Sequence, residues 1–157
     1  MGSEAARLLE AVNFAAEKHK GQRRKDPEGT PFINHPIDTD TTLSEIEERF
    51  GEEVRRVVEE VTDDKELPKM ERKRLQVERA PGSSPRAGLV KLADKLYNLR
   101  DLNRCSPAGW SPQRVQEYFA WAARVVRGLR GRSAPMEAAL QRLFQQRGLE
   151  LELEPEP

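Results

Sequence analysis

Apolar side chains recur every three or four residues along most of the chain, which is the spacing of amphipathic helices. The first stripe predicts a helix that Ser3 caps and that reaches about Lys20. Five further stripes follow: Leu43, Ile46 and Phe50; Val54, Val57, Val58 and Val61; Leu89, Leu92, Leu96 and Leu99; Val115, Phe119, Ala122, Val126 and Leu129; Met136, Leu140, Leu143 and Phe144. A shorter one after Pro68 carries Met70, Leu75 and Val77. Because no alternating strand pattern of any length is present, the pattern predicts an all-α protein.

Helix boundaries are marked by capping residues. Thr42 and Glu45 form a capping-box pattern, and Gly51 is placed to end that helix. Ser84 followed by Pro85 predicts the start of a long helix that reaches about Asn103. The pair at 111–112 repeats this start signal, and a serine at 133 opens the last helix.

The amino-acid composition excludes several classes of protein. The 157 residues fit one domain, and 27 Lys and Arg balance 27 Asp and Glu, which argues against a nucleic-acid coat. No apolar run reaches the ~18–20 residues of a membrane helix, and the N-terminus does not resemble a signal peptide. The hydrophobic fraction of 36% predicts a small core. A single cysteine, Cys105, excludes an intramolecular disulfide and favours a reducing, cytoplasmic compartment.

A polar loop between residues 19 and 36 carries the first candidate chemistry. His35 precedes a proline in a tight turn, where a ring nitrogen can face a metal, although such a histidine is more often packed or capping. The basic run that includes Arg24 and Lys25 suits a phosphate clamp, with a solvated turn as the commoner alternative. Asp38 precedes a helix, where a carboxylate is favoured by the dipole and is also available as a general acid or base.

The helix around residues 91–101 carries the second candidate. Asp94, Asn98 and Asp101 share one face, opposite the leucine stripe, so the spacing favours an exposed polar face. The alternative is a polar face that looks into a groove, because Val90 and Tyr97 flank it. In the next helix, Tyr118 lies one turn after Arg114 and could contact a nucleotide, whereas a half-buried aromatic is the simpler interpretation.

Two stretches, HKGQRRKDPEGTPFINHP and KLADKLYNLRDL, resemble in this order the hydrolase domain of the RelA/SpoT family, in its small single-domain metazoan form. EEVTDDKELPKMERK and WSPQRVQEYFAWA extend the resemblance over residues 1–149, followed by an acidic tail, 150–157, that we expect to be disordered. The resemblance implies an HD-domain helical bundle of about six to seven helices. It also implies a manganese-dependent hydrolase that removes pyrophosphate from the 3′ position of guanosine tetraphosphate (ppGpp), with NADPH as a further substrate.

Residue roles follow from the same resemblance. The metal ligands correspond to His35 and Asp94, and the catalytic acid to Asp38. The substrate side corresponds to Arg24, Lys25, Tyr97 and Asn98, with Lys69, Arg114 and Tyr118 at the rim. The expected partner is a small nucleotide, with no nucleic-acid polymer and no membrane, and the oligomeric state stays open.

One departure from the family pattern bears on activity. The family uses an adjacent His-Asp pair as two of its four metal ligands, and no His-Asp dipeptide occurs in this sequence. Ile37 runs directly into Asp38, where the pattern places roughly 25–30 more residues, about two average helices. Intact flanks favour an alternative transcript or a gene-model gap. We therefore expect impaired catalysis, with a non-catalytic nucleotide-binding or partner-binding module as the alternative.

Overall fold

The structure is a computed structural model that describes residues 42–64 and 66–149. Backbone contacts divide the chain into two compact units, Met1–Lys65 and Glu66–Pro157. Every regular element in the described residues is helical, as the apolar spacing predicted. None of these helices combines the length and apolarity that a membrane crossing needs. The expectation of a single HD-type domain over residues 1–149 stays a prediction.

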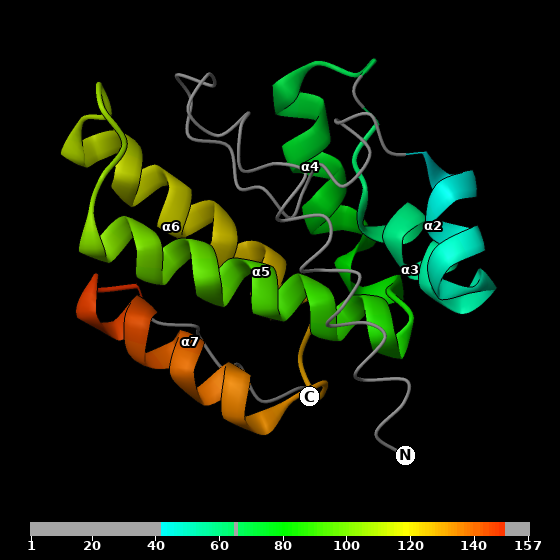
Figure 1. Ribbon diagram of the computed structural model, residues 1–157. Helices are drawn as coiled ribbons and strands as arrows, with labels where there is room; N and C mark the ends of the chain where they lie inside the picture. The colour runs from blue at the N-terminus through cyan, green and yellow to red at the C-terminus, as the bar shows by residue number, and fades with distance from the viewer. Residues whose placement is uncertain (1–41, 65, 150–157) are drawn as a thin grey trace. The chain divides into compact units, whose positions relative to one another are not determined.

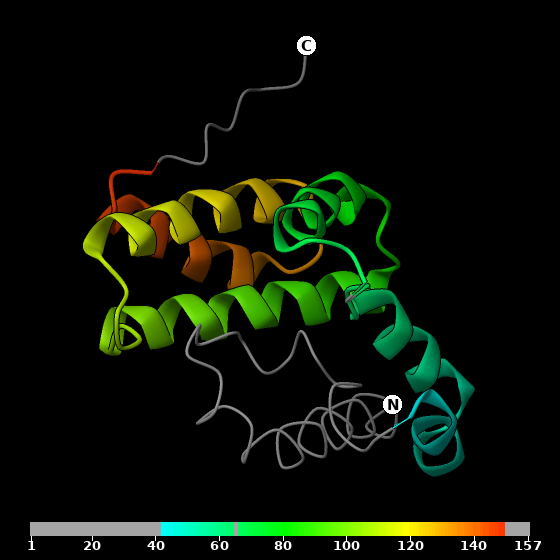
Figure 2. The same ribbon diagram turned by 90° about the horizontal axis from the view of Figure 1, so that it is seen from above.

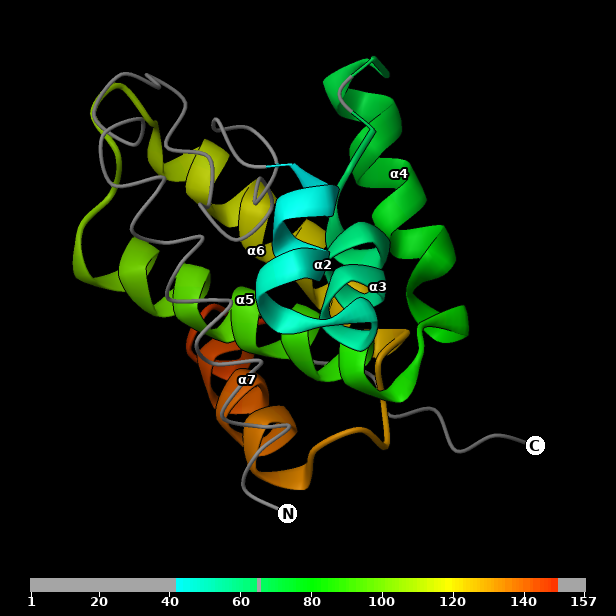
Figure 3. The same cartoon turned by 45° about the vertical axis from the view of Figure 1, so that its right-hand side comes forward.

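The described part of the first unit is a pair of short helices. Helix α2 spans Leu43–Phe50 and begins at Thr42, whose hydroxyl accepts a hydrogen bond of 3.1 Å from the Glu45 backbone N–H. It ends at Gly51, whose φ of 94° lies in the left-handed region that glycine tolerates. Helix α3, Glu52–Val61, follows at once. Figure 3 shows the two helices side by side, and their shared apolar cluster is centred on Ile46, Val54 and Val58.

The described residues of the second unit, 66–149, form four α-helices and one short 3₁₀ turn. They are α4 (Lys69–Arg79), η2 (Ala80–Gly82), α5 (Pro85–Arg104), α6 (Pro112–Arg127) and α7 (Ala134–Gln146). The serine caps predicted from sequence are confirmed, because Ser84, Ser111 and Ser133 each accept a backbone hydrogen bond in the first turn. Helices α5, α6 and α7 pack against one another, and Figures 1 and 2 show the three running roughly along one axis.

A single apolar core holds the second unit together. Its completely buried apolar side chains come from η2, α5, α6, α7 and the turn after α6: Ala80, Leu92, Leu99, Phe119, Ala122, Leu129, Leu140 and Phe144. Helix α4 joins the core through α6, because the indole N–H of Trp121 donates a 3.1 Å hydrogen bond to the backbone carbonyl of Lys73. Burying several such side chains, at ~1.5–3 kcal/mol each, is the main source of stability here.

Two apolar positions depart from the predicted stripes. Leu89, expected to face inward with Leu92, Leu96 and Leu99, is an exposed side chain. At 100° per residue Leu89 falls close to Leu96 around the α5 axis, so its exposure reflects what covers the first turns of α5 and not a drift of the stripe. Met70 was expected to share an apolar face of its helix and is 81% exposed in the first turn of α4.

The end of α6 approaches the 3₁₀ turn so closely that a side chain has no room. A Cβ at Gly128 would lie 2.8 Å from the Cβ of Ala80 and 3.0 Å from Cδ of Pro81. Both neighbours belong to a short, rigid segment, and Ala80 is completely buried. A glycine at 128 is therefore what allows α6 to pack against η2.

Gly128→Ala should lower the free energy of unfolding by ~1–3 kcal/mol, the usual cost of overpacking. Gly82→Ala is the matched control, because a Cβ there meets nothing within 4 Å and the residue is not in the left-handed region. Urea denaturation of the two variants beside the parent measures both effects. Equal stability of the two variants would show that α6 and η2 separate easily.

Candidate functional site

A cluster of charged and polar side chains, Asp94, Lys95 and Asn98, is buried along the middle of α5. The carboxylate of Asp94 accepts hydrogen bonds from Lys95 Nζ at 2.9 Å and from Asn98 Nδ2 at 3.1 Å. Asp94 and Lys95 are each 2% exposed, and Lys95 is among the largest fully buried side chains of the described residues. The ammonium of Lys95 also lies 4.6 Å from the ring centroid of Trp121 on α6. The pair is thus neutralised internally and held against an aromatic ring.

This burial corrects the exposed polar face that the spacing favoured. Asp94 and Asn98 do lie on the face opposite the leucines, but that face is covered. The reason is the central position of α5, which packs on both α6 and α7 and therefore has two buried sides. The alternative, that the polar face looks inward, describes these two residues correctly. Tyr97, which flanks them, is 42% exposed.

Beside this cluster lies a surface of cations and aromatic rings. The ammonium of Lys73 on α4 lies 5.1 Å from the ring centroid of Trp121 and 5.6 Å from that of Tyr118. The guanidinium of Arg114 on α6 stacks 4.2 Å from the ring centroid of Trp110. The three rings touch in sequence, with centroids 6.0 Å and 5.3 Å apart. We call these five residues the cation–aromatic cluster.

Two polar atoms of the cation–aromatic cluster are buried without a partner among the described residues. They are the hydroxyl of Tyr118, in a side chain that is 7% exposed, and the indole N–H of Trp110. The Asn98 side chain lies close enough to the hydroxyl to lower its pKa, yet makes no hydrogen bond of ordinary geometry with it. Burial, and then the charge of Asp94, raise the pKa of Tyr118 well above its usual range, so the hydroxyl keeps its proton and remains a donor.

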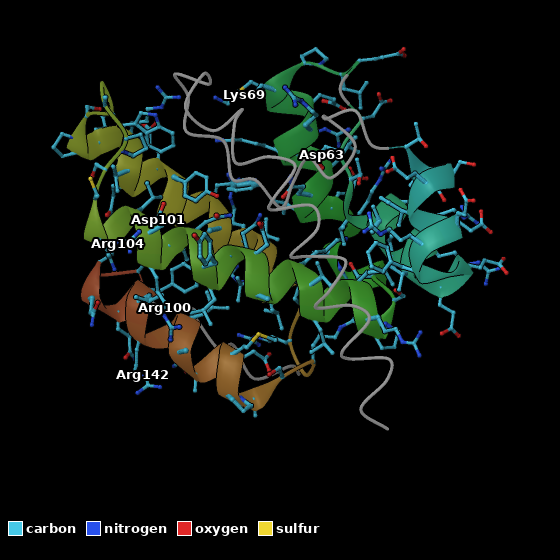
Figure 4. All side chains as sticks on the ribbon, viewed as in Figure 1. Asp63, Lys69, Arg100, Asp101, Arg104 and Arg142 are labelled. Carbon is cyan, nitrogen blue, oxygen red and sulfur yellow. The ribbon has the colours of Figure 1, made fainter. Side chains whose placement is uncertain are left out.

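The residues predicted from sequence fall into two groups. Asp94, Asn98 and Tyr118 come together, and Arg114 lies one helical turn before Tyr118. Tyr118 is more deeply buried than the half-buried aromatic that was expected. Figure 4 shows Lys69 at the start of α4. The predicted positions at Arg24, Lys25, His35 and Asp38 lie outside the described residues.

Sequence reasoning missed Lys73, Lys95, Trp110 and Trp121. A signal for two of them was present in the spacing, because Lys73 follows Lys69 by four residues and Trp110 precedes Arg114 by four. Nothing in the local pattern separates Lys95 from an ordinary exposed lysine. Its burial depends on α6 packing against α5, which is a tertiary contact.

The neutral total charge conceals a strong asymmetry. Residues 66–149 contain 17 Lys and Arg against seven Asp and Glu, a formal charge of +10. Residues 42–64 contain three Lys and Arg against nine Asp and Glu, a formal charge of −6. Figure 4 labels three further cations of the basic segment, Arg100 and Arg104 on α5 and Arg142 on α7. The candidate site therefore lies in a segment whose potential attracts anions.

Comparisons with known proteins place this site in context. A family model described as an HD domain matches residues 33–124. The chain is 63% identical to the guanosine-3′,5′-bis(diphosphate) 3′-pyrophosphohydrolase MESH1 of Homo sapiens, over 95% of this chain and 99% of that protein. It is 45% identical to the protein of the same name from Drosophila melanogaster, over 92% of this chain and 97% of that protein.

A solved structure agrees with these relatives. It is described as a metazoan ortholog of SpoT that hydrolyses ppGpp and plays a role in starvation responses. Its TM-score with this chain is 0.78 at 45% sequence identity, over 92% of this chain and 97% of that chain. The all-α HD-domain fold predicted from sequence is thereby confirmed.

The relatives are also longer inside the aligned region. The human alignment runs over 177 positions, whereas 95% of this chain is about 149 residues, so about 28 positions have no counterpart here. The Drosophila alignment, with 173 positions against about 144 residues, leaves about 29. Both values fall in the roughly 25–30 residues, about two average helices, expected to be missing.

Membership of the HD-domain family implies a divalent metal ion. The residues that the structure describes do not by themselves form a site for such an ion. No group of three or more His, Cys, Asp and Glu side chains able to hold a metal exists in residues 42–64 and 66–149. The carboxylate of Asp94 is already hydrogen-bonded to the ammonium of Lys95. A divalent ion on Asp94 would lie close to that ammonium, and like charges so close in a buried place repel strongly.

Breaking the Asp94–Lys95 pair on one side should destabilise the fold. Asp94→Asn leaves the Lys95 ammonium buried without its counter-ion, and we expect a loss of ~3–5 kcal/mol. The double variant Asp94→Asn/Lys95→Met removes both charges and should recover most of that loss. Thermal and urea denaturation of both variants measure this. If Asp94→Asn alone unfolds like the parent, the pair is not a determinant of stability.

Proposed function

The chain belongs to the HD-domain family, among the guanosine-3′,5′-bis(diphosphate) 3′-pyrophosphohydrolases, and we propose that it binds the nucleotide of these enzymes but hydrolyses it poorly. The proposal separates two properties that the intact enzymes combine. Binding depends on charge and ring contacts that remain in the chain. Hydrolysis depends on a metal site whose ligands are incomplete.

The observation that carries nucleotide binding is the cation–aromatic cluster with its two unsatisfied donors. Buried polar groups are normally hydrogen-bonded, so an unpartnered hydroxyl and indole N–H beside two cations suggest a ligand that supplies acceptors. Phosphate oxygens are such acceptors, and Arg114 is suited to them through its fixed fork of donors. We propose that Tyr118 and Asn98 orient the nucleotide while Lys69 and Arg114 hold its phosphates, with Tyr97 at the edge.

Arg24 and Lys25, from the polar loop between residues 19 and 36, complete the proposed set of nucleotide-binding residues. They belong to the loop that resembles the family pattern, and their charges suit the same anion. NADPH also carries phosphate groups on a nucleotide, so we propose it as a second ligand.

The thiol of Cys105 is exposed and forms no disulfide, which is consistent with a reducing compartment, and we propose a cytoplasmic location.

Poor hydrolysis follows from the ligand count. Of the four metal ligands that the resemblance implies, two have counterparts, His35 and Asp94, and the adjacent His-Asp pair has none. We propose that the about 28 positions missing from the alignments lie between Ile37 and Asp38, where that pair belongs. Asp38 would then remain as an acid without a metal-activated water to act on. Manganese is the ion we propose for the complete site.

The chain should bind Mn²⁺ at least ~100-fold more weakly than the human relative, because loss of a mere supporting residue costs 10–100-fold. Inserting the corresponding human segment between Ile37 and Asp38 should restore binding, whereas a glycine–serine segment of equal length should not. Metal content after dialysis measures all three proteins. Stoichiometric manganese in the unaltered chain would contradict the proposal and point to a replacement ligand.

Turnover of ppGpp should be close to the background rate, and Asp94→Ala should leave that rate unchanged. The same substitution in the chain with the human segment should abolish the restored activity, because Asp94 would then be a metal ligand. Release of pyrophosphate from ppGpp is the measurement, and binding of ppGpp by calorimetry is followed in parallel. Rapid turnover by the unaltered chain would refute the impairment, and absence of ppGpp binding would refute the nucleotide site.

A further inference from the structure

Lys73 occupies a place in the site for which the family resemblance implied no residue role, although its four-residue spacing from Lys69 was a signal in the sequence. It lies on α4 one turn after Lys69, and its ammonium faces the rings of Trp121 and Tyr118 at 5.1 Å and 5.6 Å. The backbone at this position is fixed, because the Lys73 carbonyl accepts the 3.1 Å hydrogen bond from the indole of Trp121. The side chain therefore begins from a defined point on the surface of α6.

The surroundings of Lys73 disfavour its charge. Burial lowers the pKa of Lys73, and the charges of Lys69, Arg114 and Lys95 lower it further in that order. Glu117 raises the pKa, as the smallest of these influences. Within residues 42–64 and 66–149, no carboxylate forms an ion pair with Lys73. The ring contacts offset part of this penalty, since a cation over an aromatic face is attracted by the negative potential of the ring.

A half-buried cation among other cations stabilises the fold no more than an apolar side chain of equal length would. It becomes favourable when an anion enters, because the anion relieves the repulsion among Lys73, Arg114 and Lys95 and gains a charge-assisted hydrogen bond. The Tyr118 hydroxyl, beside the ring face that Lys73 covers, is a buried donor without a partner. Two independent features of the same spot therefore call for a group with several acceptor oxygens and negative charge.

We propose that Lys73 is a further substrate-binding residue, which holds a phosphate group of the nucleotide between α4 and α6 beside Arg114 and the Tyr118 hydroxyl. The inference rests on the proposed nucleotide binding and deepens it, because it adds a cation and a place for one phosphate. The ligand class is a phosphorylated nucleotide, and inorganic pyrophosphate shares the chemistry that Lys73 recognises.

The test is calorimetric binding of ppGpp, and separately of inorganic pyrophosphate, to the full chain and to three variants. Lys73→Met removes the charge and keeps the length, and should weaken both ligands about tenfold, the effect of one charge-assisted hydrogen bond. Lys73→Arg keeps the charge and can keep the ring contact, and should bind within about threefold of the parent. Arg79→Met is the matched control, because it removes one exposed charge from the last turn of the same helix and should change binding less than about twofold.

Thermal unfolding without ligand separates a binding role from a structural one. Because the folded protein disfavours the charge of Lys73, the midpoint of Lys73→Met should equal or exceed that of the parent, while its stabilisation by ppGpp shrinks. A midpoint lowered by several degrees, with binding reduced only as far as unfolding explains, would overturn the inference. Unchanged binding by Lys73→Met would overturn it and leave the proposed nucleotide site intact. If the parent chain binds neither ligand, the proposed function fails, and the role of Lys73 fails with it.

Discussion

Helix α5 has to bury an apolar face and a polar face at the same time, and the rest of the second unit is arranged around that requirement. Leu92 and Leu99 enter the core, while Asp94 and Asn98 are covered on the opposite side and Lys95 is buried between the two faces. A buried charge is tolerated only when it is paired and hydrogen-bonded, so α6 has to bring an aromatic ring over Lys95. The same ring then anchors α4 through its indole nitrogen. One pair of charges thus couples three helices.

That coupling explains why the site is rich in cations and poor in counter-ions. Once Asp94 is neutralised by Lys95, it no longer balances the charges on α4 and the start of α6. Lys73 and Arg114 face aromatic rings instead of carboxylates. In an HD-domain protein with a full ligand set, a metal ion would compete for the same carboxylate. On the function proposed above, the arrangement in this chain holds an anionic ligand and does not activate water.

The helices were largely predictable from sequence, because their signals are local. Ser84, Ser111 and Ser133 mark starts that the structure confirms, and Gly51 marks an end. The site was predictable only in part. Asp94 and Asn98 were found, but their burial was not, since helical spacing shows which residues share a face and not what covers that face. Lys95 and Trp121 depend on contacts between helices, for which a single sequence gives no direct signal. Lys73 and Trp110 had only a four-residue spacing from other predicted residues as a signal.

The uneven placement of charge makes the isoelectric point a poor guide to how the protein behaves as a colloid. With a sequence pI near 6.8, the chain carries almost no net charge at neutral pH, yet residues 66–149 alone carry +10 and residues 42–64 carry −6. The chain therefore carries one strongly basic segment and one strongly acidic segment. A cation-exchange resin can bind the basic segment, and an anion-exchange resin can bind the acidic one. Solubility should then be lowest in dilute buffer, where opposite segments of neighbouring molecules attract, and should rise when moderate salt screens that attraction.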